Sequence, residues 1–314
     1  MTQVTLEPLR TASGPDAEAF LATTPAEALV DAIRRTDDDA LRALIGRDEI
    51  RLAAVRGVLG RLHEYADPTR LAVTTGRVRV DLTRDDHRLG VHLLVLDGGR
   101  IDVVTDVPRD EPADVVLATT VIGFIRLVSG QGDAALDYLA GRLSIAGDCA
   151  LALALGSLFT IPGTDAVAVD PTALDPVDVS RALHGVSTEH LREVMASGFR
   201  PIVLGEIFRR LPGYVNPRRA ARAELVVGFR LLGAPDGEPE RYVVRIDHGV
   251  ATVDEEVGDG RGERHATITC EGYDFLRLAT GHLKAVTGVL RGQLKVKGDK
   301  AKALQFAGMI DFPA

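Results

Sequence analysis

An internal repeat constrains the fold of this chain more than any other feature of its sequence. The segment from Gly141 to Asp148, GRLSIAGD, matches the segment from Gly292 to Asp299, GQLKVKGD, at an offset of 151 positions. The same offset pairs three further positions: Phe124 with Phe275, Arg126 with Arg277 and Gly130 with Gly281. A repeat of this length predicts two domains of one fold in tandem.

The two copies are predicted to span 25–163 and 176–314. Pro25 and Pro176 mark their starts, and the offset drifts by one or two positions upstream, as small loop insertions and deletions would cause. Residues 1–24 then form an N-terminal extension. Residues 164–175, TDAVAVDPTALD, form a linker that is rich in turn-forming residues.

Within each copy the apolar spacing is first helical and then changes to strands. In the second copy, a helix that carries Phe208 and Leu211 is expected to end near Pro212. In the first copy, Val78 and Val80 alternate with charged residues, which predicts a half-buried strand. Because the strands are grouped between helices rather than alternating with them, each copy is predicted to be α+β.

The end of each copy resembles a known family. Phe275-Leu-Arg-Leu-Ala-Thr-Gly281, the segment 290–299 and an amphipathic final helix resemble the sterol carrier protein type 2 domain, and the segments 124–130 and 141–148 repeat the pattern. The resemblance implies a five-stranded sheet covered by helices around an apolar tunnel for a sterol, a fatty acid or acyl-CoA. It implies neither a catalytic residue nor a cofactor.

Ten apolar residues are predicted to contact the lipid. Phe306 and Met309 on the closing helix, with Leu155 and Leu158 as their counterparts, are the main candidates, because this helix often covers the cavity in the resembling family. A simple core position explains most of the ten individually. The full prediction is Phe275, Leu278, Leu290, Leu304, Phe306 and Met309 in the second copy, and Phe124, Leu127, Leu155 and Leu158 in the first.

Several functional classes lack support in the sequence. No catalytic or phosphate-binding motif occurs, and none of the eight histidines meets a histidine in the other copy. The acidic loop 254–260 lacks the spacing of a calcium site and is interpreted as a solvated hairpin loop. The net charge of −8 and the absence of tryptophan argue against nucleic-acid binding. With two cysteines and no signal-peptide pattern, a cytoplasmic location is expected.

Every lysine of the chain lies between Lys284 and Lys302. This clustering predicts transient contact with anionic membranes, and a solvated helix face is the alternative. The first copy lacks the lysines, so the two copies are not expected to bind lipid equally. The predicted membrane contacts are Lys295, Lys297, Lys300 and Lys302, and their counterparts are Ser144, Ala146, Cys149 and Leu151.

The closing helix of the first copy, 148–159, carries no charge after Asp148. A helix that is apolar all round is normally buried, so this helix is predicted to pack between the copies and to join them as an intramolecular pseudo-dimer. Homodimerisation and membrane contact are the alternatives. Together these features predict a non-catalytic lipid-binding or lipid-transfer protein. A scaffold with filled cavities is the second hypothesis, and an enzyme is the third.

Overall fold

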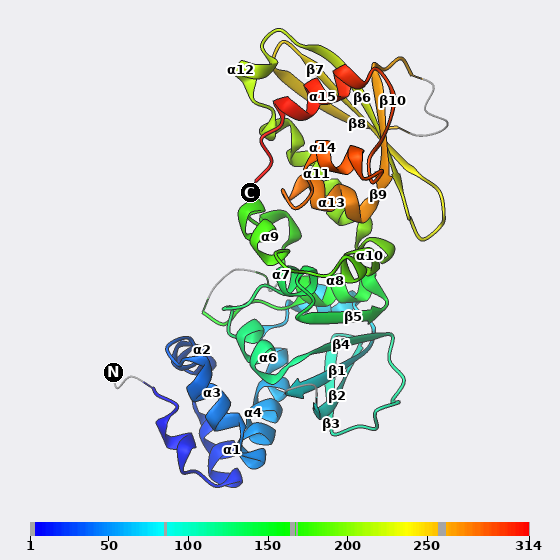
Figure 1. The fold of residues 1–314 in the computed structure, drawn as a ribbon. Helices are drawn as coiled ribbons and strands as arrows, with labels where there is room; N and C mark the ends of the chain where they lie inside the picture. The colour runs from blue at the N-terminus through cyan, green and yellow to red at the C-terminus, as the bar shows by residue number, and fades with distance from the viewer. Residues whose placement is uncertain (1–3, 85–86, 164–166, 168, 257–261, 314) are drawn as a thin grey trace. The chain divides into compact units, whose positions relative to one another are not determined.

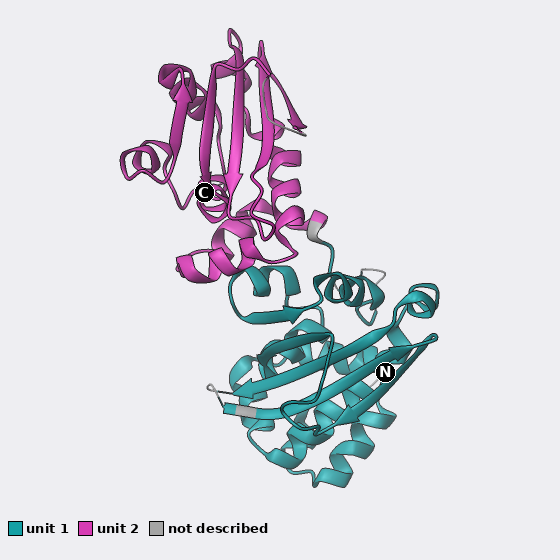
Figure 2. Ribbon diagram, turned by 90° about the vertical axis from the view of Figure 1, so that its right-hand side faces the viewer, with its two compact units in different colours: residues 1–170 teal, residues 171–314 magenta. Residues whose placement is uncertain are grey.

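The computed structural model describes residues 4–84, 87–163, 167, 169–256 and 262–313. The chain divides into two compact units, Met1–Asp170 (unit 1) and Pro171–Ala314 (unit 2), coloured separately in Figure 2. The division falls inside the predicted linker, 164–175, part of which lies outside the described residues, as does part of the acidic loop 254–260. The exact bounds of the two copies remain a prediction.

Unit 1 is an α+β domain in which helices precede and follow a five-stranded sheet (Figure 1). Its elements are η1 (Glu7–Arg10), α1 (Gly14–Thr23), α2 (Ala26–Arg34), α3 (Asp38–Ile45), α4 (Asp48–Gly60), η2 (Leu62–Tyr65), α5 (Pro68–Val73), β1 (Gly76–Arg84), β2 (His87–Asp97), β3 (Arg100–Thr105), β4 (Val115–Thr120), α6 (Val121–Val128), α7 (Ala134–Leu139), β5 (Leu143–Gly147) and α8 (Cys149–Leu158).

Unit 2 likewise has helices before and after a five-stranded sheet, which confirms the predicted α+β class for both units. Its elements are η3 (Pro171–Ala173), α9 (Pro176–Ala182), α10 (Thr188–Ala196), α11 (Arg200–Tyr214), α12 (Pro217–Ala220), β6 (Glu224–Leu232), β7 (Glu240–Asp247), β8 (Val250–Glu255), β9 (Ala266–Glu271), α13 (Gly272–Ala279), α14 (Ala285–Leu290), β10 (Lys295–Gly298) and α15 (Lys300–Met309).

The two sheets have the same strand order. In unit 1 the order is β3-β2-β1-β4-β5, and in unit 2, written in the corresponding direction, it is β8-β7-β6-β9-β10. In both sheets the central pair, β1 with β4 or β6 with β9, is parallel and the other pairs are antiparallel. A parallel pair between neighbouring strands needs a long crossover, which the intervening antiparallel strands supply.

The strands form where apolar and polar residues alternate. Along β6, Val227, Phe229 and Leu231 are fully buried and face the core of unit 2. In unit 1 the buried positions Val78, Val80 and Leu82 of β1 follow the same rule. The alternation therefore predicted the inner face of both central strands.

The end of α11 agrees with the sequence-based expectation. α11 ends at Tyr214, two residues beyond Pro212, because a proline in the last turn removes a single amide donor and the next two residues complete the turn. Residues 4–24 of the predicted extension are packed into unit 1: Leu6, Leu9 and Leu21 belong to its hydrophobic core. The apolar residues of that segment thus have a structural role.

A glycine and an aspartate precede each closing helix. Gly147 and Gly298 have φ angles of 99° and 94°, in the region that favours glycine. Asp148 accepts hydrogen bonds from the amides of residues 150 and 151 at the start of α8. Asp299 does the same for residues 301 and 302 at the start of α15. The glycine allows the tight turn, and the carboxylate caps the helix.

The uncharged helix α8 is covered partly by its own unit. Leu151 lies against Gly76 of β1, and Leu155 and Leu158 belong to the same core. On another side of α8, the amide of Val169 donates a 3.0 Å hydrogen bond to the carbonyl of Gly156, and the Val169 side chain lies over that glycine. The segment after the helix therefore shields part of a surface that the sequence had assigned to the second copy.

Candidate functional site

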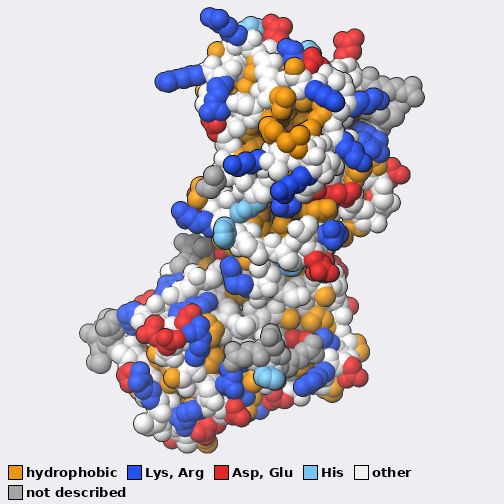
Figure 3. All heavy atoms as spheres, viewed as in Figure 1, with side chains coloured by type: hydrophobic (Ala, Val, Ile, Leu, Met, Phe, Trp, Pro, Cys, Tyr) orange, Lys and Arg blue, Asp and Glu red, His pale blue; other side chains and the backbone are white. Residues whose placement is uncertain are grey.

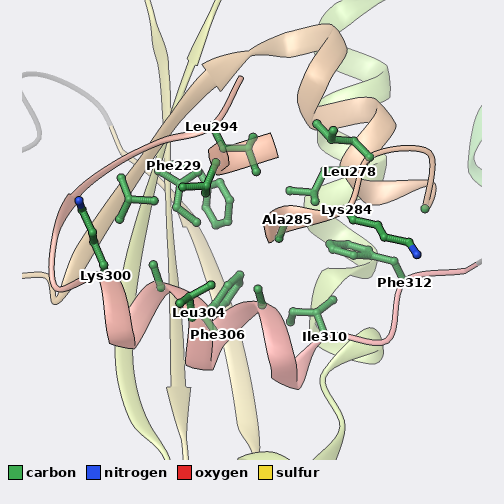
Figure 4. Close-up of a pocket in the computed structure, with 17 residues that line it drawn as sticks. Phe229, Leu278, Lys284, Ala285, Leu294, Lys300, Leu304, Phe306, Ile310 and Phe312 are labelled. Carbon is green, nitrogen blue, oxygen red and sulfur yellow. The ribbon is translucent and has the colours of Figure 1, made fainter. Parts of the chain in front are cut away.

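Unit 2 contains an apolar cavity of about 350 Å³. Figure 4 shows α15 on one side of it and the segment around Ala285 on the other, with the strands of the sheet behind. Because these elements are far apart in the sequence, the cavity depends on the packing of the whole unit. Its lining residues are Phe229, Ile268, Leu278, Gly281, Leu283, Lys284, Ala285, Val289, Leu294, Val296, Lys300, Ala303, Leu304, Phe306, Ala307, Ile310 and Phe312.

Three of the six residues predicted to contact lipid in the second copy line this cavity: Leu278, Leu304 and Phe306. Phe275 and Met309 are buried in the surrounding core and are not lining residues. Leu290 ends α14 with its side chain 81% exposed. Whether any of the six contacts a lipid stays a prediction.

Phe275 packs against Phe229, which lines the cavity. The two ring centroids lie 5.3 Å apart, and Phe229 in turn meets Phe306 edge-to-face at 5.7 Å. Phe208 stacks on both Phe275 and Tyr242. This aromatic cluster fixes one wall of the cavity, because paired rings prefer a small set of orientations.

Phe229 itself was missed as a lining residue. The signal was present in the sequence, since the alternation along β6 places Phe229 on the inner face. On α15, the lining residues Ala303, Phe306 and Ala307 recur at helical spacing. The spacing shows which face of the helix is buried, but not that a cavity lies in front of it.

The charged residues among the lining residues are Lys284 and Lys300, and Figure 4 shows them at opposite ends of the group. Lys284 immediately precedes α14, and Lys300 begins α15. Within the described part of the chain, no lysine forms an ion pair, whereas Arg264 pairs with Glu256 and Arg219 with Asp311. The two ends of the cavity therefore carry lysines that have no ion-pair partner among the described residues.

Three of the four unit 1 residues predicted to contact lipid lie in or against its core. Leu155 and Leu158 are buried there, and Phe124 lies partly buried against them. Leu127 is half-buried. At the sequence positions that correspond to Lys284 and Lys300, unit 1 has Asp133, which caps α7, and Cys149. The charges that mark the ends of the unit 2 cavity are thus not repeated in unit 1.

Burial raises the pKa of several titratable groups of unit 2, among them Tyr242, Cys270 and Asp274. Burial raises the pKa of the Cys270 thiol to about 12, which leaves almost no thiolate at neutral pH. Burial also raises the pKa of Asp274, while Arg277 and Gln293 act in the opposite direction. The Asp274 carboxylate accepts a 2.8 Å hydrogen bond from Gln293, so a structural bond explains this group.

One group of potential metal ligands occurs in the described chain, formed by Glu224, Asp247 and His248, and all three are exposed. The Asp247 carboxylate lies 2.5 Å from Nδ1 of His248 and raises the pKa of the imidazole. The protonated ring that this contact favours does not bind metals. The contact is explained as a surface ion pair.

Comparison with known proteins gives a family match within the first unit. Residues 58–160 match the SCP-2 sterol transfer family. The match begins within α4 and extends just beyond α8, so it includes the entire sheet of unit 1. The resemblance inferred from the repeat motifs is thereby confirmed for the SCP-2 segment of unit 1.

Unit 2 gives a different match. Residues 204–314 match the family described as the alkyl sulfatase C-terminal region. This segment begins within α11 and covers the sheet and the cavity of unit 2. It supports a second SCP-2-like unit only weakly. Among curated proteins, none matches this chain.

Three solved structures illustrate the similarity. Sterol carrier protein 2 like 2 from Aedes aegypti is 21% identical, with 35% of this chain and 95% of that chain covered and a TM-score of 0.29. Sterol carrier protein 2 from Yarrowia lipolytica is 19% identical, with 39% and 88% covered and a TM-score of 0.25. The sec-alkylsulfatase Pisa1 from Pseudomonas sp. is 14% identical, with 43% and 25% covered and a TM-score of 0.30.

The match to the alkylsulfatase covers only a quarter of that enzyme. Its name therefore does not assign an activity to this chain. A separate finding concerns membranes: none of the described helices is long and apolar enough to cross a bilayer.

Proposed function

We propose that this protein is a non-catalytic lipid carrier that holds its ligand in the unit 2 cavity. The apolar cavity of about 350 Å³ is the observation that carries the proposal, because it falls in the size range of small-molecule sites. Each methylene group removed from water contributes about 0.8 kcal/mol, so an acyl chain can bind without a precise polar constellation. The SCP-2 match of unit 1 supports lipid binding as a general role.

Among sterols, fatty acids and acyl-CoA, the cavity favours a ligand with an anionic group. Lys284 and Lys300 supply positive charge at its ends, and neither has an ion-pair partner among the described residues. A hydrogen bond between an ammonium group and a carboxylate or phosphate is stronger than one between neutral groups. A fatty acid should therefore bind more tightly than the fatty alcohol of the same length.

The double variant Lys284→Met and Lys300→Met tests this proposal. We expect fluorescence titration to show that the variant loses about tenfold in affinity for a fatty acid and little for the matching alcohol. The matched control is Lys295→Met with Lys297→Met. Lys295 and Lys297 flank the lining residue Val296 on β10, so they point away from the cavity.

Three outcomes of this titration are informative. If the parent protein binds neither ligand, the carrier function is wrong. If the parent binds both equally, the headgroup preference is wrong while the carrier function stands. If the control variant loses as much affinity as the test variant, the lysines act through their summed charge rather than at the cavity.

The second hypothesis, a scaffold with filled cavities, is best supported by unit 1. Its predicted lining residues Leu155 and Leu158 are buried in the core, and its counterparts of the cavity lysines are Asp133 and Cys149. We infer that unit 1 acts mainly as a structural or interaction domain and that unit 2 carries the ligand. A competition experiment tests this inference: unlabelled lipid is used to displace a labelled fatty acid from the full chain. Displacement in two steps would indicate a second class of binding sites.

We also propose that the two units arose by tandem duplication. Beyond the shared strand order, equivalent hydrogen bonds support this origin. In unit 1 the amide of Asp67 donates to the carbonyl of Leu158, and in unit 2 the amide of Asn216 donates to the carbonyl of Met309. The amides of Asp148 and Asp299 likewise bond to the carbonyls of residues 114 and 265. A structure-based alignment of the two units in an experimental structure tests the proposal.

The pseudo-dimer and the cytoplasmic location are further proposals. The uncharged surface of α8 supports close packing of the units, and the two free cysteines support a reducing compartment. Small-angle X-ray scattering of the full chain would distinguish one rigid body from two units that move independently. Cell fractionation would test the location.

The predicted membrane contact through Lys295, Lys297, Lys300 and Lys302 is likewise a proposal. Its support is that none of these lysines forms an ion pair within the described residues, so their charge is not neutralised locally. Flotation with neutral and anionic vesicles tests it, and equal binding to both would reject it.

A further inference from the structure

Unit 2 exposes a group of large apolar side chains beside its cavity. Val286, Val289 and Leu290 on α14 are 58%, 39% and 81% exposed, and Leu304 on α15 is 52% exposed. We call these four residues the α14–α15 face. The other exposed large apolar side chains of the described chain lie on four different elements: Val73, Val104, Val177 and Val250. Figure 3 shows the apolar area in the upper part of the molecule, with basic side chains around it.

The arrangement of the α14–α15 face is that of an amphipathic helix turned outward. Val286, Val289 and Leu290 follow a spacing of three and four residues, so they share one side of α14. In an ordinary surface helix this side would face the core. Here the core is contacted instead by Gly288, which packs closely on Leu294 and Leu283. An exposed apolar side of a helix indicates a binding surface.

This face is continuous with the cavity. Val289 and Leu304 belong both to the α14–α15 face and to the cavity lining. A partner that covers the face would therefore also cover part of the cavity entrance. This continuity distinguishes the face from the isolated exposed valines elsewhere.

The charge around the face indicates the kind of partner. The chain carries a net charge of −8, yet its five lysines all lie within the segment 284–302 that contains α14 and the start of α15. Lys284 precedes α14 and Lys300 begins α15, and neither is paired among the described residues. An apolar strip with a cationic border is complementary to a bilayer surface that contains anionic lipids.

We propose that the α14–α15 face docks onto an anionic lipid bilayer, with Val286 and Leu290 inserted among the headgroups and the cavity entrance directed at the membrane. This inference rests on the proposed carrier function and adds the route by which the ligand enters. A lipid then passes between bilayer and cavity without crossing bulk water. The hydrocarbon chain therefore avoids the free-energy cost of exposure.

The double variant Val286→Glu and Leu290→Glu tests the docking. Neither residue lines the cavity, and both are exposed, so the fold and the cavity are retained. We expect flotation with vesicles of phosphatidylcholine and phosphatidylserine to show binding of the parent and a loss of at least about tenfold in the variant. The matched control is Val250→Glu on β8, which is 67% exposed and distant in sequence from the face.

Uptake of a soluble fluorescent fatty acid, measured without vesicles, separates the two proposals. We expect the double variant to take up the fatty acid like the parent while failing to float. Absence of uptake in the parent contradicts the carrier function. Equal flotation of parent and double variant, or equal loss in the Val250→Glu control, overturns the docking. A dimer of the parent that the double variant disrupts, without vesicle binding by either, would identify a second copy of the chain as the partner instead.

Discussion

Among individual residues, His92 in unit 1 has a buried and incompletely hydrogen-bonded side chain. Its side chain lies on β2, is 2% exposed, and its Nδ1 atom has no hydrogen-bond partner among the described residues. Burial lowers the pKa of the imidazole, Asp106 opposes this effect and Arg56 adds to it. The folded protein therefore binds a proton at this site more weakly than the unfolded chain does.

This difference predicts a pH-dependent stability of unit 1. The unfolded histidine has a pKa of about 6.5. The neutral His92 side chain therefore contributes fully to the free energy of unfolding above that pH. This contribution decreases as the pH falls below it, because the unfolded chain takes up the proton first. We expect His92→Leu to reduce the loss of melting temperature between about pH 7 and about pH 5, a range that brackets the unfolded pKa of about 6.5. Parallel melting curves for parent and variant over this range would contradict the assignment.

At the level of elements, the glycine before each closing helix is the most constrained position. At Gly147 a Cβ atom would overlap the carbonyl oxygen of Asp114, and at Gly298 it would lie 2.6 Å from that of His265. Both glycines also have positive φ angles. The repeated Gly-Asp pair is thus required by the backbone path from β5 or β10 into the closing helix.

We expect Gly147→Ala and Gly298→Ala each to destabilise the unit that contains it by about 1–3 kcal/mol or more, through backbone strain and the overlap with a carbonyl group. Chemical denaturation followed by circular dichroism measures the effect. Gly213→Ala serves as the control, because no atom lies within 4 Å of the added Cβ there and its φ is not positive. A variant of Gly298 as stable as this control would show that the turn can relax.

At the scale of the whole molecule, the two units share one fold but differ in the residues around the closing helix. Both units retain the strand order and the capped closing helix. Both also have a buried arginine in the first turn of a long helix: Arg51 in α4 of unit 1 and Arg200 in α11 of unit 2. They differ in what lies beneath the closing helix. Unit 2 has Lys300 and Phe306 at a cavity, whereas unit 1 has Cys149 and the core residue Leu155.

This asymmetry predicts a stoichiometry of one lipid per chain. Native mass spectrometry of the full protein, after incubation with excess fatty acid, should show a single added ligand mass at saturation. The reason is that the ends of the unit 2 cavity carry lysines which unit 1 does not repeat. Two bound ligands of similar affinity would contradict the division of roles between the units.

The sequence alone predicted the features that depend on local pattern. The alternation of residues such as Val78 and Val80 indicated the strands, and the Gly-Asp pairs marked the closing turns. The α+β class followed from the order of these patterns. The family assignment also followed from a motif, since strand, turn and helix cap lie within eight consecutive residues, 141–148. Such features need only neighbouring residues, so periodicity and turn chemistry suffice to find them.

The tertiary structure decided which of the buried residues border the cavity. Helical spacing indicates that one side of a helix is buried, but Phe306 faces the cavity while Met309, on the same helix, packs in the core. Phe229 and Lys284 enter the site from a strand and a loop about fifty residues apart, so no local pattern unites them. Leu290 shows the converse, because a large apolar residue predicted for the interior lies on the surface. A cavity is a gap left by the packing of distant elements, and its position is fixed only when those elements have come together.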